Sequence, residues 1–382
     1  MGIIRTKSMV YLDYSAHTPP DREVMAAFMN TELDNPGNAN SPHAYGMQAM
    51  ELVKSAQNHI RDLMKAPDHE VIFTSGATEA NNLAIKGIAE SSRHRGKHIV
   101  STPIEHSSVS APLSYLQEKG WEIDLVRIGR DGKVDLEDLD RLIRDDTVLV
   151  TCPYVDGELG TIQPVREMAS IIAGHPGCRF HIDATQAFGK TEVLSDIADT
   201  LSLSGHKFYG INGSGLLLRR KTVSLVPLLN GGASTTVYRS GTPAAGLAVS
   251  LDKAMTAAVE HLEERNRLVS ALNSELRSRL SEYRKVLFNS PEDAVPHILN
   301  ISVGNIKGKD FQQALSARGI CVSVKSACSV DNLPSRSVFA ISRDRKRALS
   351  SWRISLSHLT TTEELNEFMK AFDDCLKELE NG

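Results

Sequence analysis

The stretch EVIFTSGATEANNLAIKGIAESS, residues 70–92, determines the fold class of this chain. Its first residues are rich in β-branched and aromatic side chains, which is typical of a buried strand. A run of small residues follows, and the remainder repeats apolar side chains at helical spacing. The segment is therefore predicted to form a strand, a tight turn and a helix, the unit from which parallel sheets are built.

The same alternation continues to about residue 220. Further predicted strands are HIVST, WEIDLVRI, TVLVTCPYV, RFHIDA and GLLLRR, and helical patterns such as VREMASIIAG lie between most of them. This order predicts an α/β fold with a mainly parallel sheet that helices cover on both faces. Ligands of such sheets bind at the carboxyl ends of the strands.

The pattern changes after residue 243. One long helical stretch covers residues 244–280, and shorter strand and helix patterns follow it. Near the C-terminus, Thr361 and Glu364 have the spacing of a capping box ahead of a helix with one apolar face. We expect a smaller α+β domain here. The predicted domains are residues 15–245 and residues 246–382, the latter together with residues 1–14.

Composition argues against several classes of protein. The 382 residues include 43 lysines and arginines against 47 aspartates and glutamates, so no basic excess favours nucleic acid or an anionic membrane. No run approaches the roughly 20 apolar residues of a membrane span, and the N-terminus lacks a secretory pattern. The five cysteines lack CxxC spacing, which argues against a disulfide framework and a metal site. The expectation is a soluble cytoplasmic protein.

Small residues in FTSGATEANN, residues 73–82, leave backbone N–H groups free at a predicted helix start. That geometry suits a phosphate group. Ser75, Gly76 and Thr78 could equally form a turn with a capping threonine. On its own this stretch leaves both interpretations open.

Two charged residues stand in unusual settings. Asp183 ends an apolar strand pattern, where its carboxylate must be paired, either as a helix cap or with a cationic ring nitrogen. Lys207, in SLSGHKFYG, either extends to solvent or forms a Schiff base with an aldehyde. A phosphate loop, such an acid and such a lysine together are what pyridoxal phosphate requires.

The motifs YLDYSAHTPP, FTSGATEANN, EHSS, HIDATQAFGK, SGHKFYG, YRSGT and KSACS, in this order, resemble those of the cysteine desulfurases. That family belongs to the class V aminotransferase branch of fold-type I pyridoxal-phosphate enzymes. The resemblance runs from about residue 10 to about residue 370. It implies a large cofactor-binding domain, a smaller C-terminal domain, pyridoxal 5′-phosphate as cofactor and L-cysteine as substrate.

The resemblance also implies roles for individual residues. Lys207 would hold the cofactor covalently, Asp183 would pair with its ring nitrogen, Gln186 would hydrogen-bond its ring hydroxyl oxygen, and His106 would stack on the ring. The phosphate-binding residues would be Ala77, Thr78, Ser204 and His206, with Thr242 from a neighbouring subunit. A homodimer is therefore part of the prediction.

Cys328 is the residue that defines the reaction implied by the resemblance. Its thiolate would attack the sulfur of the substrate, which leaves a persulfide on the protein and alanine as product. Lys207 would also serve as the base for the substrate Cα proton. Arg353 and Asn38 match residues that bind the substrate carboxylate. The sulfur would pass to an acceptor protein for iron–sulfur cluster or thio-cofactor assembly.

The chain departs from the family pattern near the substrate. DGE, residues 156–158, stands where NNE is usual, so Gly157 removes one hydrogen bond worth about 1 kcal/mol. The other departures are Ser234, Thr235 and Lys325. One alternative is a related lyase or aminotransferase that does not use Cys328, such as a selenocysteine lyase. Another is a catalytically silent scaffold with the same fold.

Overall fold

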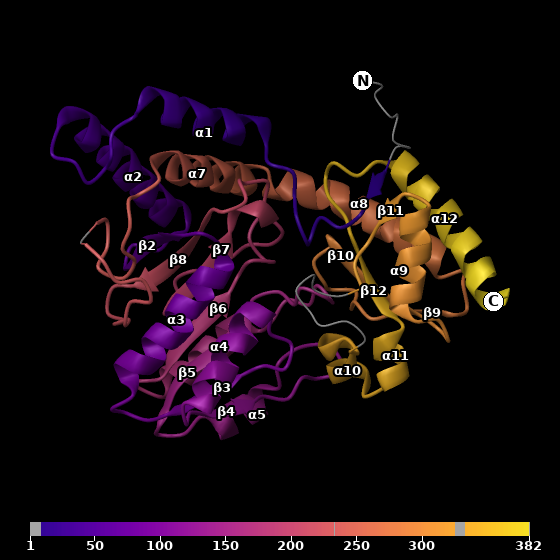
Figure 1. Cartoon of the computed structure of the whole chain (residues 1–382). Coiled ribbons are helices and arrows are strands. Elements are labelled where there is room, and N and C mark those ends of the chain that lie inside the picture. Colours follow the sequence, from indigo (N-terminus) through magenta and orange to yellow (C-terminus); the bar gives the residue numbers. More distant parts are fainter. Residues whose placement is uncertain (1–8, 233, 325–332, 382) are drawn as a thin grey trace.

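The computed structural model describes residues 9–232, 234–324 and 333–381, which form a larger and a smaller unit (Figure 1). The strands are β1 Val10–Tyr11, β2 His69–Thr74, β3 His98–Ser101, β4 Glu122–Leu125, β5 Thr147–Pro153, β6 Arg179–Asp183, β7 Thr200–Ser204, β8 Gly215–Arg220, β9 Val286–Phe288, β10 Ile298–Val303, β11 Ile320–Cys321 and β12 Ser351–Ser355. The helices are α1 Arg22–Asp34, α2 Ala44–Leu63, α3 Ala77–Ser92, α4 Ser107–Glu118, α5 Leu136–Leu142, α6 Val165–Ala173, α7 Ala245–Glu260, α8 Leu262–Leu280, α9 Gly308–Ala317, α10 Arg336–Ser342, α11 Arg345–Leu349 and α12 Thr362–Asn381.

Among the described residues, the larger unit contains a seven-stranded sheet in the order β2-β8-β7-β6-β5-β3-β4. Neighbouring strands run parallel except at β8, which is antiparallel to both β2 and β7. The connection from β7 to β8, residues 205–214, is too short for the crossover that a parallel neighbour needs. The prediction of a mainly parallel sheet is confirmed, and β8 is the exception.

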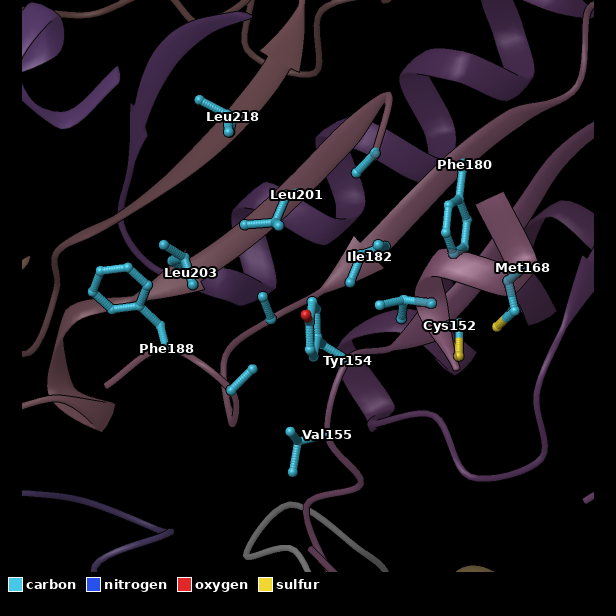
Figure 2. Close-up of a cluster of buried hydrophobic side chains, with 14 of the residues drawn as sticks. Cys152, Tyr154, Val155, Met168, Phe180, Ile182, Phe188, Leu201, Leu203 and Leu218 are labelled. Atoms are coloured by element: carbon cyan, nitrogen blue, oxygen red, sulfur yellow. The ribbon is translucent and has the colours of Figure 1, made fainter. Parts of the chain in front are cut away.

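Helices cover both faces of this sheet, as predicted. On one face α3 and α4 pack against side chains such as Ile99 and Leu149, and on the other α5, α6 and α7 pack against a second core that includes Val100 and Val150. Successive residues of one strand enter different cores because strand side chains alternate between faces. Figure 2 shows part of the second core, with Met168 of α6 near strands β5 and β6.

The smaller unit is built on an antiparallel sheet in the order β12-β10-β9, and β1 pairs in parallel with β11. Its core is largely aliphatic but contains a group of aromatic side chains, in which Phe311 of α9 stacks on Trp352 of β12 at 5.2 Å between ring centroids. At the start of α12 the N–H of Thr361 donates to Glu364 Oε2 at 2.9 Å, and the N–H of Glu364 donates to Thr361 Oγ1 at 3.2 Å. The predicted capping box is confirmed.

The helical stretch predicted over residues 244–280 is divided at His261 into α7 and α8. Leu251 and Met255 of α7 pack into the core of the larger unit, whereas Val269 and Leu276 of α8 pack into the core of the smaller one. Figure 1 shows α7 beside α1 and α2, with α8 leading into the smaller unit. Because α7 packs with the larger unit, we propose His261 as the domain boundary in place of the predicted position near residue 245.

Within the described ranges, no helix combines the length and the apolarity needed to cross a bilayer.

Candidate active site

A cavity of about 450 Å³ lies at the carboxyl ends of the parallel strands. The segments that follow β2, β3, β5, β6 and β7 line it, and Arg353 reaches it from β12 of the smaller unit. This is the place where the predicted fold class binds its ligands. The cavity therefore brings together residues from motifs that are far apart in the sequence.

Most of the predicted site residues line this cavity, namely Lys207, Asp183, Gln186, His106, Ala77, Thr78, Ser204, His206 and Arg353. Asn38 and Thr242 are exposed and do not belong to the lining contributed by the described residues. Asn38 Oδ1 instead accepts a hydrogen bond from the N–H of Asn40 at 2.9 Å. Cys328 lies outside the described residues. Leu333 and Pro334, the first described residues after it, are part of the lining.

Lys207 is positioned by a short helical turn that follows β7. The turn begins at Gly205, where a Cβ atom would lie only 2.5 Å from Ser214 Oγ, so any other residue here would force Ser214 to move. The half-buried Lys207 side chain donates from Nζ to the carbonyl oxygen of Ser15 at 2.7 Å and to that of Ala16 at 2.8 Å. The amine therefore sits at the cavity wall, held by backbone acceptors.

Asp183 ends β6, and both of its carboxylate oxygens accept hydrogen bonds. Oδ2 accepts from Asn81 Nδ2 at 2.8 Å and Oδ1 from the N–H of Thr185 at 3.0 Å, while the residue is only 7% exposed. Asn81 is itself held, because its Oδ1 accepts from His181 Nε2 at 2.9 Å. These bonds satisfy the buried carboxylate and fix its orientation.

Sequence reasoning did not single out Asn81. The sequence did contain a sign of its role. Asn81 is a polar residue on the face of α3 that is otherwise apolar and buried, beside Ala80 and Leu83.

His106 is the residue before α4, and its ring caps that helix. Nδ1 accepts a hydrogen bond from the N–H of Ser108 at 3.1 Å, so the ring proton of the neutral histidine is on Nε2. Burial lowers the pKa of His106, and the positive charge of Lys207 acts in the same direction, whereas the Asp183 carboxylate opposes it. An uncharged aromatic ring therefore lines the cavity.

The start of α3 has the properties of an anion site. Its N-cap is Gly76, at a φ of 145°, and no side chain caps the helix, so the first N–H groups keep donor capacity. Thr78 lies inside the first turn, and the alternative of a capping threonine is not observed. Glu79 in the same turn is paired with Arg239, with Arg239 Nε 2.9 Å from Glu79 Oε1.

Two further side chains flank this helix start. Ser204 Oγ lies 3.0 Å from His206 Nδ1, and burial and the charge of Lys207 lower the pKa of His206 to about 4. Backbone N–H groups, a hydroxyl and a neutral imidazole thus surround one end of the cavity, and these donors fit a phosphate group.

Arg353 connects the smaller unit to the cavity. The residue is 2% exposed, and its guanidinium donates from Nη1 to the carbonyl oxygen of Gly157 at 2.7 Å and from Nη2 to Asp13 Oδ1 at 3.0 Å. A Cβ atom at Gly157 would lie 3.5 Å from Gln186 Cγ, an ordinary contact. The glycine that departs from the family pattern therefore leaves open space beside Gln186.

Glu105 is a second residue that sequence reasoning did not single out, although it stands in the EHSS motif. It is 3% exposed, lines the cavity, and its Oε1 accepts from Thr151 Oγ1 at 2.9 Å. Burial, with the nearby Asp183 charge, raises the pKa of Glu105 from its ordinary value of 4.5 to about 8. Glu105 is therefore a neutral acid at neutral pH.

The raised pKa of Glu105 predicts a pH-dependent effect on stability. Because the pKa in the folded state exceeds the ordinary value, the folded protein binds more protons between about pH 4.5 and pH 8, and stability falls as pH rises through that window. Glu105→Gln keeps the shape but cannot ionise. At pH 8 the free energy of unfolding of the Glu105→Gln apoprotein should exceed that of the wild-type apoprotein by on the order of 3 kcal/mol.

Urea unfolding of both apoproteins at the two ends of the window measures this difference. Near pH 4.5 the two proteins should differ little. A variant that is less stable than wild type at pH 8 would contradict the prediction.

Comparison with known proteins agrees with this geometry. The sequence profile of the aminotransferase class-V family matches residues 10–368. The chain is 37% identical to the mitosomal cysteine desulfurase of Trachipleistophora hominis, over 98% of this chain and 88% of that protein. It is 35% identical to the cysteine desulfurase IscS of Methanosarcina thermophila, over 97% of this chain and 93% of that protein.

Comparison with solved structures indicates the same family. A NifS-like protein matches with a TM-score of 0.91 at 33% identity, over 97% of this chain and all (100%) of that one. SspA in complex with cysteine matches with a TM-score of 0.80 at 31% identity, over 93% of this chain and 100% of that one. Enzymes of this family depend on pyridoxal 5′-phosphate, in agreement with the predicted cofactor. The chain thus belongs to the class-V aminotransferase family and, within it, to the cysteine desulfurases.

Proposed function

We propose that this protein is a cysteine desulfurase that converts L-cysteine to L-alanine and takes up the sulfur on Cys328. The observation that carries the proposal is the convergence of Lys207, Asp183 and His106 in one cavity, beside the uncapped start of α3. These groups match the amine, acid, ring and phosphate contacts that pyridoxal phosphate needs. Family membership then selects the substrate.

Different residues of the cavity would bind different parts of the cofactor. Lys207 would hold the aldehyde carbon, and Asp183, with its oxygens oriented by Asn81 and Thr185, would keep the ring nitrogen protonated. The start of α3, with Ser204 and His206, would bind the phosphate. When bound, pyridoxal phosphate withdraws electrons from the substrate carbon that carries the amino group.

Other groups of this chain would act on the substrate. Lys207, once released from the cofactor, would take the Cα proton, and Arg353 would bind the substrate carboxylate. The Cys328 thiolate would attack the substrate sulfur, so that a sulfur–sulfur bond forms while the carbon–sulfur bond breaks. The electron pair of that bond stays on the substrate, and protonation of its carbon gives alanine. The protein keeps a persulfide.

We propose further that the enzyme acts as a homodimer. Thr242 is not among the described residues of the lining, and it lies three residues before α7, which packs against α1 and α2. Those two helices expose apolar side chains, among them Met29, Leu33 and Met47 at 53%, 75% and 60%. Such a surface favours a protein partner. The acceptor protein, iron–sulfur or thio-cofactor assembly and the cytoplasmic location remain predictions.

The test is incubation of the holoenzyme with L-cysteine, with alanine and protein-bound sulfur measured together. Wild type should release alanine and carry persulfide on Cys328, whereas Cys328→Ser should lose both. Cys321→Ser is the matched control, because Cys321 is not among the described residues of the lining, and it should keep both.

Two other results would separate the alternatives. Alanine formation that survives in Cys328→Ser would favour a related enzyme that does not use this thiol. A colourless protein that gains no visible absorption with added pyridoxal phosphate would favour the scaffold.

A further inference from the structure

The turn that follows β6 places a buried lysine behind the cavity residue Gln186. Lys190 is 6% exposed, and its Nζ donates to Gln186 Oε1 at 2.7 Å. Gln186 lines the cavity, but Lys190 does not. Within the described part of the chain, no salt bridge joins Lys190 to a carboxylate. A buried amine with no carboxylate partner is costly, so its retention calls for a role.

The partners of Gln186 determine which way its amide faces. Nε2 donates at 2.8 Å to the carbonyl oxygen of Ser15, which can only accept, and Lys190 supplies a donor to Oε1. The flipped amide would set its N–H group against the Lys190 donors and its oxygen against the carbonyl of Ser15. The same Ser15 oxygen also accepts from Lys207 Nζ at 2.7 Å. The two lysines are thus linked through Gln186 and Ser15.

The N–H end of this amide is on the cavity side. A Cβ atom at Gly157, itself a lining residue, would lie 3.9 Å from Gln186 Nε2. We propose that Lys190 is a positioning residue, which holds the Gln186 amide so that its N–H group donates to the ring oxygen of bound pyridoxal phosphate. This inference rests on the proposed function, because it assumes that the cofactor occupies the cavity.

The surroundings of Lys190 are cationic. The charged and titratable groups that face it are Lys207, Arg353, His206, His297, Arg265, Tyr14 and Tyr209. Burial lowers the pKa of Lys190 well below its ordinary range, and the charges of Lys207 and Arg353 act in the same direction. Burial and these charges therefore disfavour the protonated amine, and the neutral amine still donates an N–H to Gln186 Oε1.

Loss of Lys190 acts on the bound cofactor through Gln186. The covalent linkage between Lys207 and the cofactor is a cationic acid, and a hydrogen-bond donor to the neighbouring ring oxygen lowers its pKa. A ring oxygen that has lost the Gln186 donor holds the linkage proton more strongly, so this pKa rises. The proton on this linkage changes the visible absorption of the cofactor, so a pH titration of the spectrum reports the pKa.

The experiment titrates the visible spectrum of the holoenzyme from mildly acidic to alkaline pH in wild type and in Lys190→Met. The apparent pKa should rise by about one unit in Lys190→Met. Lys221→Met is the matched control, because Lys221 is exposed and its Nζ binds the carbonyl oxygen of Pro67 at 2.9 Å. It should titrate as wild type does. Methionine is a suitable replacement, since an apolar side chain of similar length commonly substitutes for a buried charge.

A second set of variants separates positioning from charge alone. Gln186→Met should raise the apparent pKa with Lys190 intact, and Lys190→Met should add much less in that background than in wild type. Lys190→Gln, which keeps an N–H donor without the charge, should shift the pKa less than Lys190→Met does.

Three results would overturn the inference: an unchanged apparent pKa in Lys190→Met, a spectrum that does not titrate, or a full Lys190 effect in the Gln186→Met background. If wild type carries no cofactor on Lys207, the proposed function fails instead.

Discussion

Replacement of Lys207 by alanine is expected to abolish desulfuration, with a fall in kcat of at least about 10³-fold. The variant loses the covalent attachment of the cofactor and the base for the substrate proton in one change. No other lysine is among the described residues of the lining, and Nζ is held by the carbonyl oxygens of Ser15 and Ala16. Alanine release from L-cysteine measures the fall.

Borohydride reduction followed by mass spectrometry tests the attachment itself. In wild type the pyridoxyl group should be found on Lys207, and in Lys207→Ala it should be absent. Lys221→Ala, which removes an exposed lysine outside the cavity, should keep both the label and the activity. A label on another side chain of the wild-type protein, such as the neighbouring Lys190, would contradict the proposed site.

Replacement of Asp183 by asparagine is expected to lower kcat by about 10²- to 10⁴-fold while the fold is kept. The neutral amide cannot hold a proton on the ring nitrogen, so the ring withdraws electrons less strongly. Both carboxylate oxygens accept hydrogen bonds, from Asn81 and from the N–H of Thr185, and an amide can satisfy only one of them. The free energy of unfolding should therefore fall by about 1 to 2 kcal/mol as well.

Steady-state kinetics and urea unfolding measure these two effects separately. Asp124→Asn at the sheet edge, where the side chain is 39% exposed, is the control and should change kcat little. An Asp183→Asn enzyme within about tenfold of the wild-type kcat would show that the acid does not act on the ring nitrogen.

Patterns that depend on neighbouring residues could be predicted from the sequence. Alternating strand and helix periodicity led to the parallel sheet, and the spacing of Thr361 and Glu364 led to the capping box, because backbone geometry imposes both over a few residues. The cavity position followed as well, since parallel strands end at the same edge and the motifs follow those ends.

Features that depend on distant packing could not be predicted in this way. The helical pattern of residues 244–280 does not show that its first half belongs to one core and its second half to another, because an apolar face carries no information about its partner. The antiparallel direction of β8 likewise followed from its short connection to β7 and from its pairing with β2, which is distant in the sequence.

The sequence by itself determined the α/β fold, the motifs at the strand ends and the resemblance that identified the cofactor. Only the tertiary structure decided that Asn81 orients Asp183, that Lys190 holds the amide of Gln186, and that Arg353 reaches the cavity from the smaller unit. The physical reason is that a buried polar group must find its hydrogen-bond partners in space, and those partners lie on other turns, helices or strands that spacing along the chain does not reveal.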